Sequence, residues 1–425
     1  MSRNSINIIQ LLFILSLASG QGRMNGYGLG HFYANQGVVN AGNGAGLLSP
    51  SFQKGVSLTN PSTWHNLKFT FLSLSYGANE NYLANQTSFN GYSGLSSAIL
   101  IVPIKSKASF GLCLRPYSDQ RISLSNINQT TFYAFSDTLN VSRTFIRSGG
   151  IMNLQLGGSY LFKDNLSLGL SFDILFGSSR QNESIDFGGS AIIASSRMRY
   201  VGVLNEYFIS YNLNSKNTIF GSYLLSLKPL ESIYQGKHLF DDTNGNGHHD
   251  FDSPFFDFPF PDSVASQSDI RNENIHAPQV FKLGTSSNFN ESSSITFEFF
   301  KSLEGGTNTS LIYIPLNNWI NSTTGQNLSF NRFSNDLSYR FIDKLSFSIG
   351  VKYLNHILKK EELKISEFGL AVGLGFKFSP IGNKLNLNYY RGNRKFDETA
   401  DKEIVQQIQI GISLADLWFV KRRQK

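Results

Sequence analysis

The chain has 425 residues, of which 16% are charged and 13% are aromatic, and its formal net charge is +7. With its many Gly, Ser and Asn residues, this composition is unlike that of a helical enzyme and is typical of short strands joined by polar turns. The basic excess is small, and no run of Lys and Arg with interleaved aromatic residues occurs before the last few residues. We therefore expect no nucleic-acid partner.

The first twenty residues have the features of a secretory signal peptide. Arg3 supplies a positive charge, residues 8–17 form an apolar core too short to span a bilayer, and residues 18–20 are small. We predict a signal peptide over residues 1–20 that is cleaved near Gly20. An uncleaved membrane anchor is the alternative interpretation.

Residues 21–66 alternate poorly between polar and apolar positions and are rich in Gly, Ser and Asn. Their apolar residues, such as Leu48 and Phe52, favour a compact plug over a disordered leader. The stretch AGNGAG at 41–46 lacks the preceding strand and following helix of a dinucleotide-binding motif. We predict that residues 21–66 form an N-terminal hatch.

From about residue 67 onward, polar and apolar residues alternate with a period of two, as in half-buried strands. The stretch NLSLGLSFDILF places Leu, Ile and Phe on one face and Asn, Ser, Gly and Asp on the other. KLSFSIGVKY and SEFGLAVGLGFKF repeat this pattern. The predicted strands are 67–78, 91–102, 108–118, 145–162, 166–177, 197–212, 217–227, 278–289, 294–303, 326–341, 345–354, 364–378, 384–391 and 403–414.

A soluble β-sandwich would also alternate, but three features favour a membrane barrel. Many strands are as long as a tilted membrane strand, short and long connections alternate, and the apolar face is unbroken. Only a closed sheet satisfies its own backbone in lipid. We predict an all-β fold in which residues 67–425 form a 14-stranded antiparallel transmembrane β-barrel with the hatch in its lumen. Short turns would face the periplasm, and the longest outer loop would span 228–277.

Cysteine usage indicates the compartment. Cys113 is the only cysteine, so neither an intramolecular disulfide nor a thiolate metal site can form. A secreted chain of this size without disulfides or helical spans suggests the bacterial envelope. We predict a monomer in the lipid of a Gram-negative-type outer membrane.

The stretch DDTNGNGHHDFD at 241–252 spaces its oxygen ligands as a calcium loop does. The candidate metal ligands are Asp242, Asn244, Asn246, His248 and Asp250. The bidentate Glu that usually closes such a loop is missing, and no helices flank it. Two interpretations stay open: a structural Ca²⁺ in the 228–277 loop, or an Asn- and Gly-rich turn with exposed carboxylates.

Four phenylalanines follow directly in SPFFDFPFPDS, namely Phe255, Phe256, Phe258 and Phe260. Exposed aromatic side chains in a loop are costly in water unless they have a use. One hypothesis is that they capture a hydrophobic ligand. The other is that they pack against neighbouring loops or the barrel rim.

Nothing in the sequence indicates catalysis. Neither GxSxG nor HExxH occurs. His249 and Asp250 beside Asp242 form the one cluster of note, and the calcium interpretation explains it better. We expect no enzymatic activity and no required cofactor.

Several short motifs resemble those of the FadL family of outer-membrane transport proteins. They are YGLG at 27–30, NAGNGAG at 40–46, LTNPSTW at 58–64 and the ending GISLADLWFVKRR. Asn60, Pro61 and Ser62 are similar to the Asn-Pro-Ala element at which the family's hatch meets the barrel, with Ser62 in place of Ala. The resemblance covers essentially the whole chain, although its motifs are short.

The resemblance implies passive uptake of hydrophobic compounds such as long-chain fatty acids. Outer loops would capture the ligand, an apolar pocket beside the hatch would hold it, and a lateral opening would release it. Lys68, Lys352 and Lys377 lie on polar strand faces, where they would either meet a ligand carboxylate or pair with the hatch or wall. The alternative is a binding or shuttle accessory in protein secretion, with a periplasmic or secretion partner. A hatch-filled lumen disfavours an ordinary porin.

Overall fold

The computed structural model describes most of the chain after the expected signal peptide. The described residues are 22–32, 37–42, 46–83, 89–104, 107–124, 130–134, 137–186, 191–244, 249–252, 254, 256–258, 270–307, 314, 316–335, 340–378, 383–397 and 402–416. Residues 1–20 and their expected cleavage site lie outside them.

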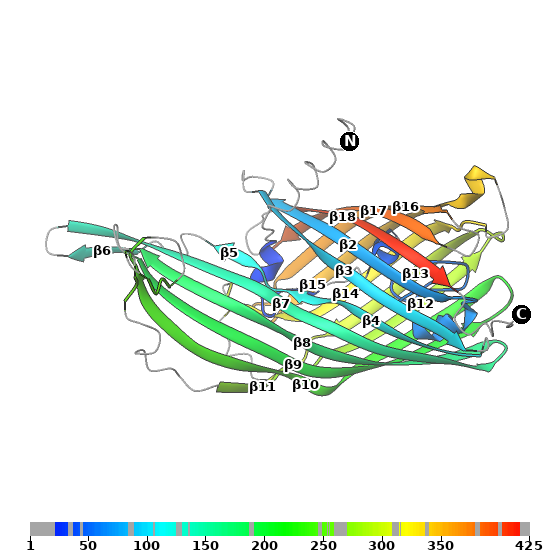
Figure 1. Ribbon diagram of the computed structural model, residues 1–425, viewed down its shortest axis with the longest axis horizontal. Coiled ribbons are helices and arrows are strands. Elements are labelled where there is room, and N and C mark those ends of the chain that lie inside the picture. Colours follow the sequence, from blue (N-terminus) through cyan, green and yellow to red (C-terminus); the bar gives the residue numbers. More distant parts are fainter. Residues whose placement is uncertain are drawn as a thin grey trace, which may run out of the picture.

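Fourteen antiparallel strands form a closed barrel, which confirms the predicted 14-stranded barrel (Figure 1). The barrel strands are β2 (Thr70–Leu83), β3 (Phe89–Ile104), β4 (Ala108–Asp119), β7 (Asp137–Lys163), β8 (Leu166–Asp186), β9 (Ala191–Asn212), β10 (Asn217–Asp242), β12 (Gln279–Asn288), β13 (Ser293–Leu303), β14 (Ile320–Arg332), β15 (Leu345–Leu358), β16 (Lys364–Lys377), β17 (Lys384–Phe396) and β18 (Lys402–Asp416). Each pairs with the next, and β18 pairs with β2 over its whole length.

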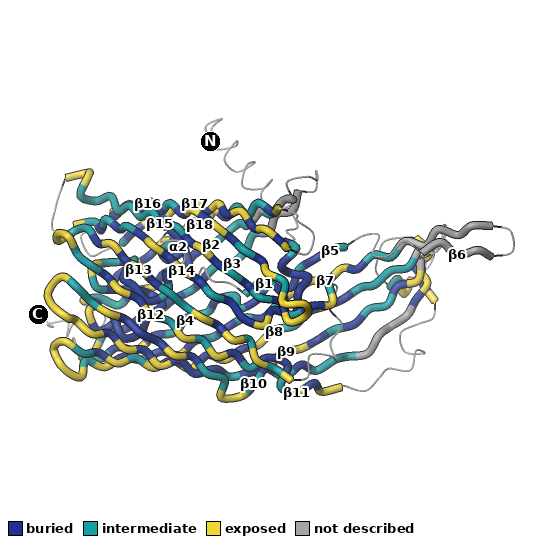
Figure 2. The backbone as a smooth tube through the Cα atoms, turned by 180° about the vertical axis from the view of Figure 1, so that it is seen from behind, coloured by how far each residue is buried: buried dark blue, intermediate teal, exposed yellow. Residues whose placement is uncertain are grey.

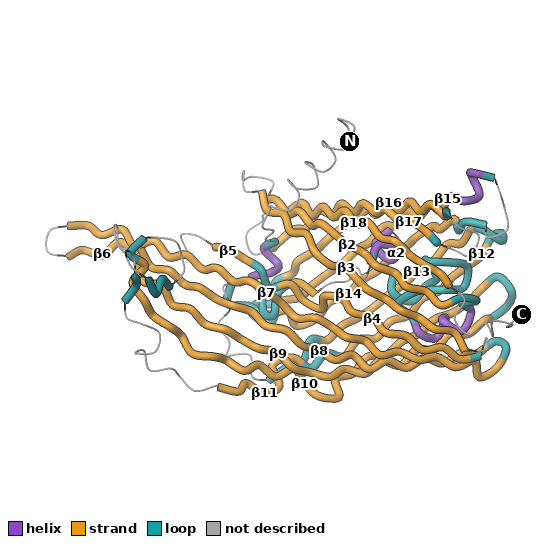
Figure 3. Tube along the Cα trace, in the orientation of Figure 1, coloured by secondary structure: helices purple, strands orange, loops and turns teal. Residues whose placement is uncertain are grey.

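Shorter elements complete the described fold (Figure 3). The additional strands are β1 (His31–Phe32), β5 (Ile122–Leu124), β6 (Thr130–Ala134) and β11 (Ile270–His276). The helices are η1 (Arg23–Gly26), α2 (Val38–Gly42), η2 (Pro61–Asn66) and η5 (Phe341–Lys344). Within the part of the chain that the structure describes, no helix is long and apolar enough to cross a membrane.

The alternation along each strand separates an apolar outer face from a polar inner face, and buried and exposed residues therefore alternate in Figure 2. In β8, Leu168, Phe172 and Phe176 are about two-fifths exposed, while Ser171 and Asp173 are buried. An apolar outer face of this extent is stable only when lipid covers it.

Strands β7 to β10 extend well beyond the rest of the barrel at one end (Figure 1). The loop predicted over 228–277 is therefore shorter than expected, because β10 continues to Asp242 and β11 begins at Ile270. Bulges between Ser226 and Glu231 and again near His238 break the alternation, with Pro229 in the first of them. A pattern-based prediction stops at such a bulge, although β9 continues to pair with β10.

The strand predicted over 326–341 is displaced, since β14 runs from Ile320 to Arg332. Its neighbour β13 begins at Ser293, which pairs with Arg332. Beyond that point no β13 residue remains to accept or donate ladder hydrogen bonds. The described residues 333–335 therefore do not continue the strand, and η5 precedes β15.

The described residues of 22–66, here called the N-terminal segment, lie inside the barrel. Residues near Gly22 approach Asn81 of β2, at the end with the long connections, whereas η2 packs against β3, β4, β7, β8 and β9 near the short turns. Between them, α2 contacts β15 to β18 and β2. The segment therefore crosses the lumen from one end to the other, and much of the apolar core forms around it.

Candidate functional site

Asn60, Pro61 and Ser62 fix the N-terminal segment to the wall. The Asn60 side chain accepts hydrogen bonds from the Ser62 backbone N–H (3.1 Å) and hydroxyl (2.7 Å), and thereby caps η2 with Pro61 in its first turn. The Ser62 hydroxyl lies 2.5 Å from that of Ser210 on β9. A Cβ atom on Gly169 would lie 2.6 Å from the Ser62 nitrogen, so the wall needs glycine there.

A second attachment comes from Glu298 on β13. Its carboxylate accepts hydrogen bonds from three consecutive backbone N–H groups, those of Leu47 (2.7 Å), Leu48 (3.1 Å) and Ser49 (2.5 Å). Such a cluster of N–H groups is a binding site for an anion. Glu298 therefore holds the N-terminal segment where it passes the middle of the wall.

A third attachment is a buried ionic cluster around Arg394 on β17. Arg394 donates to Glu367 and Glu403, each with a shortest distance of 2.7 Å, and all three side chains are at most 2% exposed. Glu403 also accepts the backbone N–H of Arg23 (2.9 Å). Lys352, one of the lysines that the sequence singled out, lies 3.5 Å from Glu367 and is thus paired with the wall. Lys377 is also buried, whereas Lys68 is exposed.

Beside the N-terminal segment, the lumen contains a cavity with about 140 Å³ of space for water-sized molecules. Its apolar lining comes from both the segment and the strands: Met24, Phe32, Leu47, Leu204, Leu224, Val280, Phe300, Ile320 and Leu354. Its charged and polar lining includes His31, Arg115, Asn153, Asp173, Glu206, Lys282, Ser302, Glu304, Thr323 and His356. The cavity therefore combines apolar walls with many convergent polar groups, and apolar walls with placed polar groups are features of small-molecule sites.

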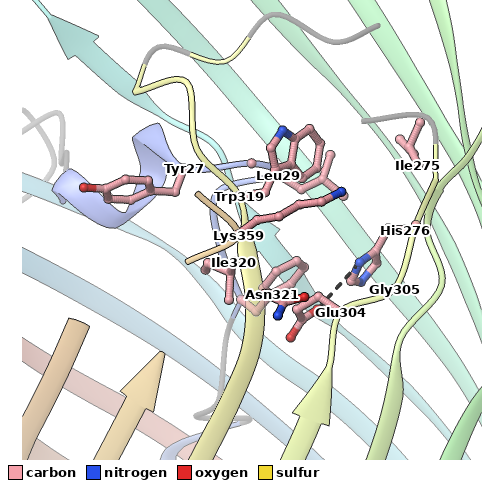
Figure 4. Close-up of a pocket in the computed structure, with 13 residues that line it drawn as sticks. Tyr27, Leu29, Ile275, His276, Glu304, Gly305, Trp319, Ile320, Asn321 and Lys359 are labelled. Atoms are coloured by element: carbon pink, nitrogen blue, oxygen red, sulfur yellow. Dashed lines mark ion pairs between the residues drawn. The ribbon is translucent and has the colours of Figure 1, made fainter. Parts of the chain in front are cut away.

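A smaller cavity of about 50 Å³ lies next to it, near the end with the long connections (Figure 4). Trp319 and Lys359 lie on one side of it, and His276 and Glu304, 3.6 Å apart, lie on the other. Both cavities are lined by Phe32, Glu304 and Ile320. The two spaces therefore adjoin at these three side chains.

The phenylalanines predicted to capture ligand are described only in part. Phe256 and Phe258 are 51% and 63% exposed, and Phe258 forms an isolated bridge with Asp241 at the tip of β10. Phe255 and Phe260 lie outside the described residues. The ligand-capture role stays a prediction.

The candidate calcium loop is likewise described in part, because Asn246 and His248 lie outside the described residues. Asn244 donates to Asp250 (2.6 Å), and Asp242 is buried. Among the described residues, no group of three or more His, Cys, Asp or Glu side chains is arranged to hold a metal ion. Calcium binding stays a prediction, and the described part of the turn is organised by another carboxylate, Asp257.

Asp257 accepts hydrogen bonds from the Thr243 backbone (2.9 Å) and hydroxyl (2.8 Å) and from the Asp250 backbone (2.9 Å). Burial raises the pKa of this carboxyl, but the hydrogen bonds from Thr243 and Asp250 outweigh it, and the pKa is lowered. Since the folded pKa lies below the unfolded one of about 4, the stabilisation is present at neutral pH and is lost on acidification through the folded pKa.

We expect Asp257→Asn, which removes the charge at every pH, to loosen this turn at neutral pH. Hydrogen exchange of residues 241–244 and 249–252 should be faster in the variant. After correction for intrinsic exchange rates, the wild-type protein should show protection as low as that of the variant only at acidic pH. Equal protection of the two proteins at neutral pH would contradict this role for Asp257.

Several residues of the site were not singled out from the sequence. Glu298, Asp173 and Arg394 are each a charged residue at an inward position of a strand, and this position was the available signal. Their partners lie far away in the sequence, so the signal did not indicate what they bind.

Comparison with known proteins adds a family and a fold. The model of the BamG family matches residues 1–425. A search of curated proteins finds no match. Among solved structures, the chain is similar to the CymD monoaromatic hydrocarbon channel, with 12% identity, 93% of this chain and 100% of that chain covered, and a TM-score of 0.59.

Two further structures are similar. A Pseudomonas aeruginosa FadL homologue has 11% identity, with 90% of this chain and 98% of that chain covered and a TM-score of 0.55. The Pseudomonas putida toluene transporter TodX has 13% identity, with 92% and 99% covered and a TM-score of 0.50. At these identities the resemblance to the FadL family holds for the fold alone. The family whose model matches the chain is BamG.

Proposed function

Because the chain belongs to the BamG family and shares its fold with channels for hydrophobic compounds, we propose that it is an outer-membrane channel for such compounds. The observation that supports this most is the apolar cavity between the N-terminal segment and the wall. Such a cavity suits the passage of a hydrophobic compound better than the diffusion of ions or other water-soluble molecules.

In this proposal the N-terminal segment acts as the hatch. Asn60 to Ser62, Glu298 and the Arg394 cluster hold it in the lumen, and a ligand passes from the outer end through the cavity. The short turns face the periplasm, as in other outer-membrane barrels. The exposed Phe256 and Phe258 stand at the outer end, where a ligand would first arrive.

A cavity-filling variant tests the proposal. Leu204 on β9 lines the cavity and is 1% exposed, so Leu204→Trp should occupy the space a ligand needs. We expect cells that carry this variant to take up a labelled long-chain fatty acid or a small hydrocarbon several-fold more slowly than wild type. Heat-modifiable migration on a gel would verify that both barrels are folded.

The matched control is Val201→Trp on the same strand, because Val201 is 45% exposed on the outer face. It should leave uptake unchanged. Equal uptake by wild type and Leu204→Trp would contradict a route through the cavity.

The second candidate is a binding or shuttle accessory in protein secretion. The observation that favours it is the extension of β7 to β10 beyond the barrel, which offers a sheet surface that a transport route does not require (Figure 1). A folded, inserted wild type that raises the uptake of neither compound would favour this candidate over the channel.

A further inference from the structure

Four arginines gather on the outer face of the sheet where β7 to β10 begin to extend beyond the barrel (Figure 1). Arg180 of β8 is the direct cross-strand partner of Arg197 of β9, so both side chains lie on one face of the sheet. Arg199 lies two residues further along β9 and shares that face. Ile233 of β10 is the direct partner of Arg199 on one side and of Arg271 of β11 on the other. Arg180, Arg197, Arg199 and Arg271 therefore form one cluster, here called the arginine patch.

The arginine patch begins just beyond the apolar outer face of the barrel. The outward positions of β8 from Leu166 to Phe176 are all apolar, and Arg180 is the second outward position after them. Ten residues that rise about 3.4 Å each on a strand tilted by about 40° span roughly 25 Å, the height of the apolar band of an outer-membrane barrel. On β9, Arg199 is the next outward position after the exposed Val201. With the long connections facing outward, the patch lies at the level of the outer-leaflet head groups.

The described part of the chain supplies little negative charge to the arginine patch. None of its four side chains forms an ion pair with a described residue. Glu231 and Glu273 are the nearest acids along β10 and β11, but Glu231 pairs with Lys228 at 3.3 Å, and Glu273 forms no ion pair with the patch. Basic residues therefore outnumber acidic ones on this face.

The arrangement of the patch itself also indicates an anion. Like charges directly opposite each other destabilise a sheet, and Arg180 lies directly opposite Arg197. Arg197 donates to the Ser178 hydroxyl at 3.4 Å, whereas its Nε–H has no hydrogen-bond partner among the described residues. An anion between the two guanidinium groups would neutralise this repulsion and accept the remaining hydrogen bonds.

We propose that the arginine patch binds the phosphate groups of a phosphorylated lipid in the outer leaflet. Guanidinium groups form paired hydrogen bonds with phosphate oxygens, and several arginines together match a head group that carries more than one phosphate. The acyl chains of this lipid would lie against the exposed Phe176 and Val201, directly below the patch. The proposed site lies on the outer face of the sheet, so it is separate from the lumen and goes beyond the channel function.

The test uses the full-length protein in a neutral detergent and fluorescently labelled lipid A that carries two phosphates. Binding is measured by fluorescence anisotropy, with unlabelled lipid A, phosphorylated or dephosphorylated, as the competitor. We expect the phosphorylated form to compete at least tenfold better, and its affinity to fall as the salt concentration rises. The double variant Arg180→Gln and Arg199→Gln should bind at least tenfold more weakly, because two charged hydrogen-bond donors are lost.

The matched control is Lys216→Gln, which removes a positive charge from the exposed turn at the opposite end of the β9–β10 hairpin. It should bind lipid A as the wild-type protein does, and heat-modifiable migration would verify that each variant is folded. Equal competition by the two forms of lipid A, or unchanged binding by the double variant, would overturn the inference. If the double variant does not fold, Arg271→Gln on β11 replaces it, and a several-fold loss of affinity is expected there.

Discussion

Glu298→Ala is expected to release the N-terminal segment from the wall and open the lumen to ions. The variant removes a carboxylate that binds three backbone N–H groups, those of Leu47, Leu48 and Ser49. Each buried N–H group that loses a charged acceptor destabilises the folded state by about 1–3 kcal/mol, and water that enters and accepts a hydrogen bond restores part of this free energy. We therefore expect the seated segment to be destabilised by about 2–5 kcal/mol. Planar-bilayer recordings should show frequent large openings that wild type rarely shows.

Two further variants make the Glu298 experiment specific. Glu298→Gln keeps one acceptor oxygen without the charge, so its conductance should lie between those of wild type and Glu298→Ala. Glu291→Ala removes an exposed carboxylate from the turn before β13 and should conduct as wild type does. If Glu298→Ala is as closed as Glu291→Ala, the segment is held by its other contacts.

Arg394→Ala is expected to lower the stability of the whole barrel. The guanidinium lies between Glu367 and Glu403 at 2.7 Å from each, and the Tyr390 hydroxyl donates to Glu367 as well. Without it, two buried carboxylates face each other, and removal of one partner from a buried ion pair typically costs about 3–5 kcal/mol. The temperature at which the folded barrel loses its heat-modifiable gel migration should fall markedly.

Arg391→Ala is the matched control, because Arg391 lies on the same strand but is exposed. It should melt close to wild type. Arg394→Lys should be intermediate, since lysine restores the charge but cannot bridge both carboxylates with a planar fork. An Arg394→Ala barrel as stable as Arg391→Ala would mean that the cluster contributes little to stability.

The sequence by itself determined the architecture. In strands such as β8 and β16, side chains alternate with a period of two, which fixes the face that points into the barrel and the face that points outward. The sheet must close because lipid cannot form hydrogen bonds with the backbone groups of an open edge. Fourteen strands were therefore predictable, with boundaries within a few residues in most cases. The largest exceptions are the extended ends of β7 to β10, at 137–144, 178–186, 191–196 and 228–242, and the displaced β14. In β10 bulges hide the continuing strand, and in β14 the alternation continues past Arg332 although β13 begins only at Ser293.

Only the tertiary structure decided what the inward polar residues do. Asp173, Glu298 and Arg394 look alike in the sequence, because each is a charged residue at an inward position of its strand. Asp173 lies beside a cavity, and Glu298 holds the N-terminal segment. Arg394 joins Glu367 to Glu403, which also accepts the backbone N–H of Arg23. The physical reason is that a local pattern fixes the direction of a side chain, whereas its partner comes from a segment up to several hundred residues away, which only barrel closure brings near.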